Sequence, residues 1–261
     1  MIRSTFLRQF AVLVAVVMFA ACGDEAPNTD VGSDTGTDDE ATDEAADETV
    51  DEVETDPTVE SGCPAPDHTS PRRLIFDAAP PMCIDPAETF VAVFDTSEGE
   101  VRVTLDTTNT PITANNFVTL ARFGYYDDTT WFRTDPSIDI IQGGAPNTES
   151  PTDPGPGYTI PDEPAFDDID GQLIGPYRYE PGQLVMARAR GRDSSSAQYF
   201  FSTGPKTALL DAQGTYVVFG QTDAAGLAVL QAVMELHEPG GQFGGAPSRT
   251  VTIRSVRIEN R

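Results

Sequence analysis

The sequence predicts a mainly β domain, a closed antiparallel barrel with a helix at each end, preceded by an acidic tether that stays disordered. Two observations lead to this class. Residues 89–261 contain several short runs typical of strands and only two segments with the periodicity of an amphipathic helix. Many short strands with two helices fit a closed antiparallel barrel. The first quarter of the chain, in contrast, has too few apolar residues to form a core.

The first 21 residues are typical of a secretory signal peptide. Arg3 and Arg8 precede an almost wholly apolar run at 10–21, which is too short for a comfortable membrane span. The run ends in Phe19-Ala-Ala-Cys22, which resembles the lipobox of bacterial lipoproteins, where the cysteine is lipidated. We therefore expect Cys22 to anchor the protein to a membrane. A plain signal peptide cleaved after an A-x-A-like site and a permanent transmembrane anchor are the alternatives.

Residues 22–60 are predicted to form a disordered acidic linker. From 23 to 60 there are sixteen Asp or Glu residues and no Lys or Arg. Such a segment cannot bury enough surface to offset its ordering entropy, and its like charges extend it. We expect a tether that holds the domain off the membrane. A calcium-binding or protein-docking tail is the alternative, although the acids lack the spacing of an EF-hand.

Localisation and partners follow from the same features. Gly23 after the lipidated cysteine resembles the outer-membrane default, so we expect a protein of the cell envelope, with its domain in the periplasm or at the cell surface. The formal net charge of −26 argues against a nucleic-acid partner, because phosphates would be repelled. Nothing in the sequence indicates an oligomer, so a monomer is expected.

Residues 61–88 form a Pro-rich lead-in that contains Cys63 and Cys83. An even pair of cysteines in an exported chain predicts a disulfide, and closing a loop of about twenty residues is worth roughly 3 kcal/mol. Two unpaired thiols are the alternative. A zinc site is poorly supported, because His68 is the only nearby imidazole.

The domain at 89–261 is predicted to begin with a hairpin of strands 89–96 and 100–105, since apolar and polar residues alternate in the second strand. A helix follows, with Thr110 as its cap, Pro111 at its first position and Gly124 at its end. Its apolar stripe consists of Ala114, Phe117, Val118 and Ala121.

A second helix is predicted at about 225–236, with His237 as a C-terminal cap. Further strands are expected at 130–133, 138–142, 184–189, 198–203, 216–220 and 249–258. In the last strand, Val251 and Ile253 fall out of phase with Val256 and Ile258, which predicts a bulge near Arg254.

Six motifs, in a fixed order, lie between about 89 and 258. They are Trp131-Phe-Arg-Thr-Asp-Pro136, Gln142-Gly-Gly144, Gly155-Pro-Gly-Tyr-Thr-Ile-Pro-Asp-Glu163, Gly182-Gln-Leu-Val-Met-Ala-Arg-Ala189, Ala197-Gln-Tyr-Phe-Phe201, and Leu210-Asp211 with Val218-Phe-Gly220. With these motifs the segment resembles a cyclophilin-type peptidyl-prolyl cis-trans isomerase of the short bacterial kind. The resemblance implies eight strands in the barrel.

The resemblance also implies an activity and a site. Arg133 is the cation that assists rotation about the X-Pro amide, and Gln142 holds the substrate backbone or positions Arg133. Phe200, Leu210 and Tyr216 form the pocket for the proline ring, with Ile140 on its wall. Ala187, Ala189 and Gln198 form the groove for the residues before the proline. The partners are proline-containing polypeptides, exported proteins among them, and no cofactor or metal is required.

Several departures from the family pattern bear on this site. One extra residue lies between Arg133 and Gln142, so either Ile138 or Asp139 takes the place of a phenylalanine that forms a pocket wall in the family. Phe132 stands where the family has histidine, and Tyr216 where histidine is frequent. Three arginines replace a neutral stretch and predict either a preference for acidic residues near the proline or an ordinary solvated loop; they are Arg188, Arg190 and Arg192.

Other functions remain open at this point. The leading alternative is a catalytically weak module of the same fold that binds proline-containing segments of a partner, and a mainly structural acidic lipoprotein is a third. Asp162 and Glu163 are adjacent carboxylates, but neighbouring residues point in different directions, so we do not expect them to act as an acid–base pair.

Overall fold

The computed structural model describes residues 62–241 and 243–261. The signal peptide, Cys22 and the acidic linker lie outside these residues, so the predictions made for them stay predictions. Within the described part, no helix is long and apolar enough to span a bilayer.

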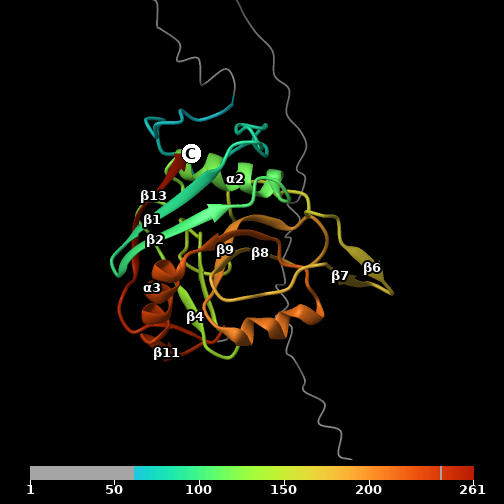
Figure 1. Cartoon of the computed structure of the whole chain (residues 1–261), viewed down its shortest axis with the longest axis vertical. Helices are drawn as coiled ribbons and strands as arrows, with labels where there is room; N and C mark the ends of the chain where they lie inside the picture. Colours follow the sequence, from blue (N-terminus) through green and yellow to red (C-terminus); the bar gives the residue numbers. More distant parts are fainter. Residues whose placement is uncertain (1–61, 242) are drawn as a thin grey trace, which may run out of the picture. The chain divides into compact units, whose positions relative to one another are not determined.

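A nine-stranded antiparallel sheet forms the centre of the domain, in the order β3-β13-β1-β2-β10-β8-β9-β5-β4. Figure 1 shows how this sheet curls around the core. Its strands are β1 (Phe90–Thr96), β2 (Gly99–Leu105), β3 (Thr129–Thr130), β4 (Arg133–Asp135), β5 (Ile140–Gly143), β8 (Gln183–Arg188), β9 (Ser195–Ser202), β10 (Val218–Thr222) and β13 (Thr252–Asn260). The mainly β class is therefore confirmed.

The strand count differs from the eight that were expected. The segment expected as one strand at 130–133 is divided into β3 and β4, and these two short strands lie at opposite edges of the sheet. Trp131 and Phe132 separate them. The Trp131 amide donates to Val251 O, and the Phe132 amide donates to Gln142 O. Closure of the curled sheet into a complete barrel stays a prediction.

The core of the sheet is rich in aromatic side chains. Phe94 is fully buried and lies 5.3 Å from Phe201 and 5.9 Å from Phe117, measured between ring centroids. Phe117 also stacks on Tyr126 at 4.9 Å. The predicted alternation in β2 is confirmed, since Val101, Val103 and Leu105 are buried while Thr104 is exposed. These rings link α2 to the inner face of the sheet.

Helix α2 (Pro111–Arg122) occupies the predicted segment, and the stripe from Ala114 to Ala121 is buried. Gly124 follows it in the left-handed conformation, with φ +62°. Thr110 precedes the helix as predicted, but its side chain does not cap the helix, because its hydroxyl donates to Asp106 O. Instead, the Glu163 carboxylate accepts from the backbone amides that begin the helix, at 2.9 and 2.7 Å.

Helix α3 (Ala224–Met234) begins where Asp223 accepts a hydrogen bond from the Gly226 amide at 2.9 Å. It packs on β2, β5 and β10, whereas α2 packs on β13 and β9. The helix ends before His237, so the prediction that His237 caps it is wrong. His237 lies in β11 (His237–Pro239), and its Nδ1 is 2.8 Å from Thr134 Oγ1.

Several elements were not predicted. A 3-10 helix, η1 (Pro205–Ala212), follows β9. Two small hairpins pair β6 (Asp167–Ile169) with β7 (Gln172–Ile174) and β11 with β12 (Gly245–Pro247). Each is too short to give a clear periodicity. The bulge near Arg254, in contrast, is confirmed, because the pairing shifts from Asp95 with Ser255 to Thr96 with Ile253 and leaves Arg254 as the extra residue.

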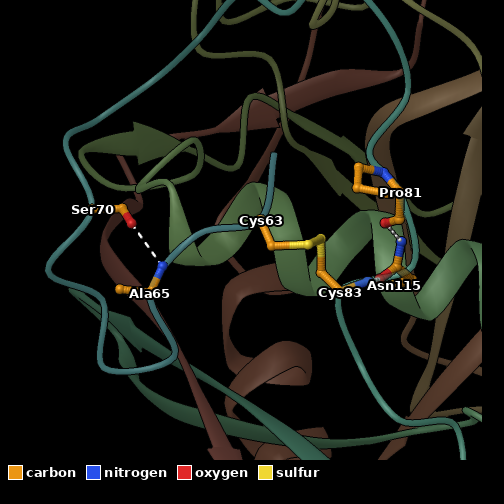
Figure 2. The surroundings of a disulfide bond; sticks show 6 residues. All are labelled: Cys63, Ala65, Ser70, Pro81, Cys83 and Asn115. Atoms are coloured by element: carbon orange, nitrogen blue, oxygen red, sulfur yellow. Dashed lines mark hydrogen bonds between the residues drawn. A yellow bond between two sulfur atoms is a disulfide. The ribbon is translucent and has the colours of Figure 1, made fainter. Parts of the chain in front are cut away.

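The predicted disulfide between Cys63 and Cys83, whose Cα atoms are 5.5 Å apart, closes a loop within the lead-in (Figure 2). Next to it, Asn115 of α2 accepts from the Cys83 amide at 2.7 Å and donates to Pro81 O at 2.8 Å. Two unpaired thiols are therefore excluded. The side chain of Phe76 is buried in the main core, so the lead-in is part of the folded domain.

Candidate active site

Arg133 and Gln142 face each other across the β4–β5 pair, because their Cα positions are in register. The Arg133 Nη1 donates to Gln142 Oε1 at 2.9 Å, and Gln142 Nε2 donates to Gln198 Oε1 at 2.9 Å. Gln198 in turn donates to Pro151 O at 3.2 Å. The structure thus joins three of the expected site residues in one chain of hydrogen bonds that orients the guanidinium.

Two further contacts hold Arg133. Its Nε donates to Phe243 O at 2.6 Å, and its Nη2 forms an ion pair with Asp135 Oδ2 at 2.8 Å. Asp135 is itself fixed, since Ser137 donates to it from both its amide and its hydroxyl. A guanidinium has five N–H donors. Among the described residues three of these donors have partners, which leaves two N–H groups for a ligand.

Glycine permits the close approach of β5 to its neighbours. A Cβ on Gly143 would lie 2.7 Å from a ring carbon of Trp131, and one on Gly144, at φ +87°, would lie 2.7 Å from Ala197 O. The Gln142-Gly-Gly144 motif therefore lets the strand that carries Gln142 lie directly against β9 and the Trp131 ring.

A small apolar cluster, separate from the main core, is formed by residues from β5, β8, β9, η1 and the segment before β10. Its buried members are Ile140, Tyr179, Val185 and Phe200, and partly buried residues packed on them include Ile138, Ala187, Leu210 and Tyr216. Phe200 and Tyr216 pack edge to face with centroids 5.5 Å apart. Five of the seven residues expected to bind substrate are thus together in this cluster. Gln198 lies beside Gln142, and Ala189 is exposed in the turn after β8.

Tyr216 is positioned through its backbone. Its amide donates to the Tyr179 hydroxyl at 2.8 Å, and that hydroxyl donates back to Tyr216 O at 3.1 Å. Burial raises the pKa of Tyr216 above its ordinary value, while the nearby charges of Arg188 and Arg133 oppose this shift. The phenol therefore stays protonated at neutral pH and keeps its donor.

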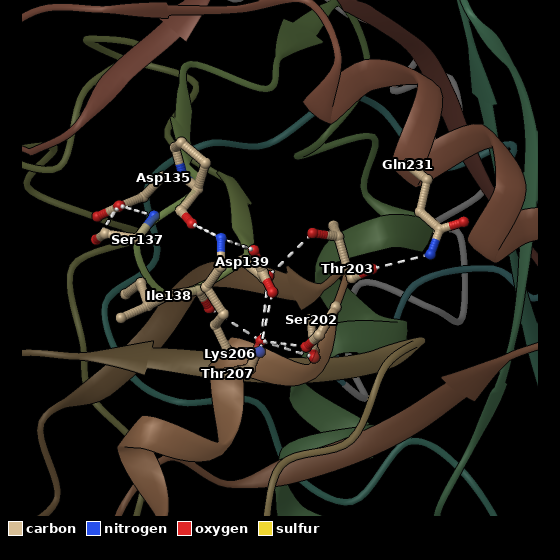
Figure 3. Close-up of polar contacts among 11 residues, drawn as sticks. Asp135, Ser137, Ile138, Asp139, Ser202, Thr203, Lys206, Thr207 and Gln231 are labelled. Carbon is tan, nitrogen blue, oxygen red and sulfur yellow. Dashed lines mark hydrogen bonds and ion pairs between the residues drawn. The ribbon is translucent and has the colours of Figure 1, made fainter.

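The side chain of Asp139 lies beside Lys206, at the start of η1 (Figure 3). Its carboxylate accepts from the Lys206 amide at 2.9 Å and pairs with Lys206 Nζ at 3.2 Å, so it binds the start of η1. Asp139 adopts a left-handed backbone conformation, φ +51°, which directs the side chain there. Ile138, the preceding residue, packs in the cluster. The extra residue in this segment is thereby accommodated, and an apolar side chain takes the position on the cluster wall.

Arg188 is folded inward rather than exposed in a basic loop. Only 6% of its side chain is accessible, and its Nη1 donates to Thr215 O at 3.3 Å. Its guanidinium lies 5.0 Å from the centroid of the Phe166 ring and 3.9 Å from an oxygen of Asp162. Arg192 donates to Phe166 O, and both Arg190 and Arg192 are exposed. Arg188 and Arg192 are therefore engaged in structural contacts.

Sequence reasoning missed Asp135 and Phe243 as neighbours of Arg133. Asp135 follows Arg133 by two residues on β4, and charge complementarity was a signal for its contact with Arg133. Phe243 is far away in the sequence, and only the β11–β12 hairpin brings its carbonyl to the guanidinium. Among the described residues, no group of three or more His, Cys, Asp or Glu side chains is arranged to hold a metal ion.

The curled antiparallel sheet thus places an arginine and two amide side chains beside an apolar cluster. The model of the family described as cyclophilin type peptidyl-prolyl cis-trans isomerase/CLD matches residues 91–258. The chain belongs to this family.

Similar proteins agree with this assignment. A probable peptidyl-prolyl cis-trans isomerase B from Mycobacterium tuberculosis is 34% identical over 180 residues, which cover 67% of this chain and 56% of the relative. A peptidyl-prolyl cis-trans isomerase from Synechococcus elongatus is 33% identical over 132 residues, 51% of this chain and 79% of that protein. The chain thus spans little more than half the length of the mycobacterial relative.

Among solved structures, a cyclophilin type peptidyl-prolyl cis-trans isomerase from Cryptosporidium parvum is similar, with a TM-score of 0.52 and 25% identity. The match covers 66% of this chain and 99% of that structure. The same protein was also crystallised in the presence of the dipeptide Ala-Pro, and that structure matches with a TM-score of 0.51.

Proposed function

We propose that the protein is a peptidyl-prolyl cis-trans isomerase in which Arg133 assists rotation about the X-Pro amide. The observation that carries this proposal is the position of Arg133. Its guanidinium is held by Gln142, Asp135 and Phe243 O next to an apolar cluster, and two of its N–H groups remain available. Membership in the isomerase family supports the same reaction.

The chemistry requires only a positioned donor and an apolar pocket. Rotation is slow because resonance gives the C–N bond double-bond character, with a barrier of about 18–20 kcal/mol. In the twisted state the prolyl nitrogen becomes pyramidal and regains a lone pair, which a guanidinium can bind. Since arginine keeps its charge at every relevant pH, the interaction favours the twisted state over both planar isomers.

The apolar cluster supplies the surface for the proline ring in this proposal. Ile140, Phe200, Leu210 and Tyr216 line it, and Ile138 adds the wall that the family forms with phenylalanine. Ala187, Ala189 and Gln198 would receive the residues before the proline. The neighbouring structure from Cryptosporidium parvum, obtained with Ala-Pro, supports a proline-containing dipeptide as the minimal ligand to test.

The cellular setting is part of the proposal. The lipobox-like Phe19-Ala-Ala-Cys22 supports a lipid anchor, and the acidic residues that follow support a tether. Together they support an isomerase that acts on exported proteins in the cell envelope, at the outer membrane, as a monomer. Labelling with a fatty-acid analogue would test the anchor, since Cys22→Ser should abolish incorporation.

A catalytically weak binding module of the same fold is the second candidate. The ion pair between Arg133 and Asp135 favours it, because a carboxylate 2.8 Å away offsets the charge that the reaction uses. Such a module would bind Ala-Pro peptides without accelerating their isomerisation.

Measurement of cis–trans exchange by NMR distinguishes the two candidates. We expect the purified chain to accelerate exchange of an Ala-Pro tetrapeptide and Arg133→Ala to lose most of this acceleration. Arg254→Ala is the matched control, because Arg254 pairs with Asp95 at 2.7 Å on the surface and is remote in sequence from the site. Equal acceleration by Arg133→Ala and the wild type would refute the role of Arg133, and no acceleration by the wild type would favour the binding module.

A further inference from the structure

A cavity of about 400 Å³ lies on Arg133, outside the apolar cluster. Phe132 and Arg133 form part of it, the segment at 149–151 forms another part, and residues from 238–241 and 243–247 complete it. Pro151, which lines the cavity, also accepts the hydrogen bond from Gln198. The cavity therefore adjoins the site through Arg133 and through Gln198.

The lining includes ring-bearing residues and two glutamates. Phe132, Phe243 and Pro151 are among the ring-bearing residues, and Glu149 and Glu238 are the acidic ones. Both glutamates are exposed, and neither forms an ion pair with any residue in the described part of the chain. Their charges are therefore available to a ligand.

Arg133 contributes less positive charge to this cavity than a free arginine would. Its ion pair with Asp135 is largely buried, with 16% and 11% of the two side chains accessible. Since the pair is close to neutral, the two glutamates determine the sign of the charge around the cavity. Positive groups are favoured there and negative groups are not.

We propose that this cavity receives the side chain of a lysine or arginine next to the target proline, so that the protein prefers clients with a basic residue beside the proline. The proposal rests on the proposed function and adds a specificity to it. Lys and Arg carry a long apolar stem and a charged end. The stem would pack along Phe132, Phe243 and Pro151, and the charged end would reach Glu149 and Glu238.

An acidic side chain at the same position would be disfavoured, because it would place a third carboxylate beside the two glutamates. A purely apolar side chain would leave the charges unused. The cavity thus predicts the opposite preference from the one expected for an exposed arginine loop. The side chain of Arg188 is buried instead of lying in such a loop, and the exposed Arg192 donates to Phe166 O.

Four peptides test the proposal, with Lys or Glu placed either directly before or directly after the proline. For each, kcat/KM for exchange is measured by NMR relative to its own uncatalysed rate. We expect Lys to exceed Glu by about two- to five-fold in at least one position at low salt, the size given by exposed ion pairs. The ratio of kcat/KM for the Lys peptide to kcat/KM for the Glu peptide should approach one at about 0.5 M salt, because salt screens the charges.

Glu149→Gln combined with Glu238→Gln should bring the ratio to one at low salt as well. Glu235→Gln is the matched control, since Glu235 is exposed at the end of α3, outside the cavity. A ratio of one in the wild type at both positions, or an unchanged ratio in the double variant, would overturn the proposal.

The experiment distinguishes a wrong proposal about the cavity from a wrong proposal about the isomerase activity. Catalysis that depends on Arg133 but treats Lys and Glu peptides equally overturns the cavity alone. If no peptide is catalysed, the proposed function fails. The dissociation constants of the four peptides, measured by NMR titration, then test the cavity: Lys peptides should bind more tightly than Glu peptides by the same factor.

Discussion

At the scale of single residues, the environment of Arg133 determines what the site can do. Gln142, Asp135 and Phe243 O each take one donor of the guanidinium, at 2.9, 2.8 and 2.6 Å. Three fixed partners orient the plane of the group before a substrate binds, which is the condition for stabilising a transition state without reorganisation. Asp135 is the partner that the resemblance did not imply.

Asp135→Ala should lower kcat/KM by about ten-fold. Hydrogen bonds to charged groups are worth roughly 1.5–3 kcal/mol, and about 1.4 kcal/mol corresponds to a factor of ten. The expected loss arises because the guanidinium would no longer be held on its Nη2 side. Asp95→Ala removes the partner of the surface residue Arg254 and should leave the activity unchanged. A rise in activity on Asp135→Ala would instead show that the ion pair weakens the catalyst.

His68 gives a residue-scale prediction about pH. Its Nε2 accepts a hydrogen bond from the Ile258 amide at 2.9 Å, so the docked ring is neutral. Burial, followed by the charge of Arg257, lowers the pKa of His68 below 6.5. The neutral form is therefore favoured in the fold, and this stability is present above pH 6.5 and is lost as the pH falls through the folded pKa.

The free energy of unfolding should accordingly decrease between pH 7 and 5, and His68→Gln should reduce the slope of this decrease. Urea denaturation at several pH values measures the slope, with His237→Gln as the control. If His68→Gln and the wild type show the same dependence of unfolding free energy on pH, His68 is not the group responsible.

At the scale of elements, α2 depends on a residue about fifty positions away in the sequence. The Glu163 carboxylate accepts from the Ile112 amide, the Thr113 amide and the Thr113 hydroxyl. A carboxylate at a helix N-terminus satisfies free N–H groups and interacts favourably with the helix dipole. Asp162, the preceding residue, accepts instead from the Asp193 amide at 3.0 Å, so the two carboxylates have separate structural contacts.

Glu163→Gln should lower the free energy of unfolding by about 1–2 kcal/mol, because the amide loses the charge and one acceptor. Urea denaturation provides the measurement. Glu180→Gln, at an exposed site between Tyr179 and Pro181, is the control and should change little. Equal stability of the Glu163→Gln variant and the wild type would show that Glu163 contributes nothing to α2.

Elements with local signals were predicted well from the sequence. The periodicity of α2 and β2 and the phase shift at Arg254 are properties of neighbouring residues, so they were visible without any tertiary contact. The direction of Asp139 was not, because it depends on the start of η1, which lies more than sixty residues further along the chain. The contact between Arg133 and Phe243 O was missed for the same reason, and the cavity beside it arises from three separate segments.

At the scale of the whole molecule, the lead-in extends the domain beyond the part that resembles the family. The disulfide joins Cys63 to Cys83, and Asn115 of α2 binds the backbone at Pro81 and Cys83. Phe76 adds a buried ring, and the Phe76 amide donates to Pro156 O at 2.8 Å. The lead-in thus contributes to the stability of the domain that carries the site.

Removing the disulfide by Cys63→Ser with Cys83→Ser should cost about 3 kcal/mol of stability, the value for a loop of this size. Denaturation in urea with and without dithiothreitol gives the same comparison for the wild-type chain. Reduction should lower the midpoint for the wild type and leave the double variant unaffected. A midpoint that is insensitive to reduction would show that the lead-in does not stabilise the domain.

The central claim is that Arg133 binds the twisted amide more strongly than the planar one. The most direct test is the exchange rate of an Ala-Pro peptide while it is bound, measured by NMR line shapes in saturating protein together with its dissociation constant. We predict that Arg133→Ala slows bound-state exchange by about 10²–10³-fold, the usual cost of losing one transition-state donor, and changes the affinity much less. Loss of affinity without a change in the bound-state rate would contradict the account.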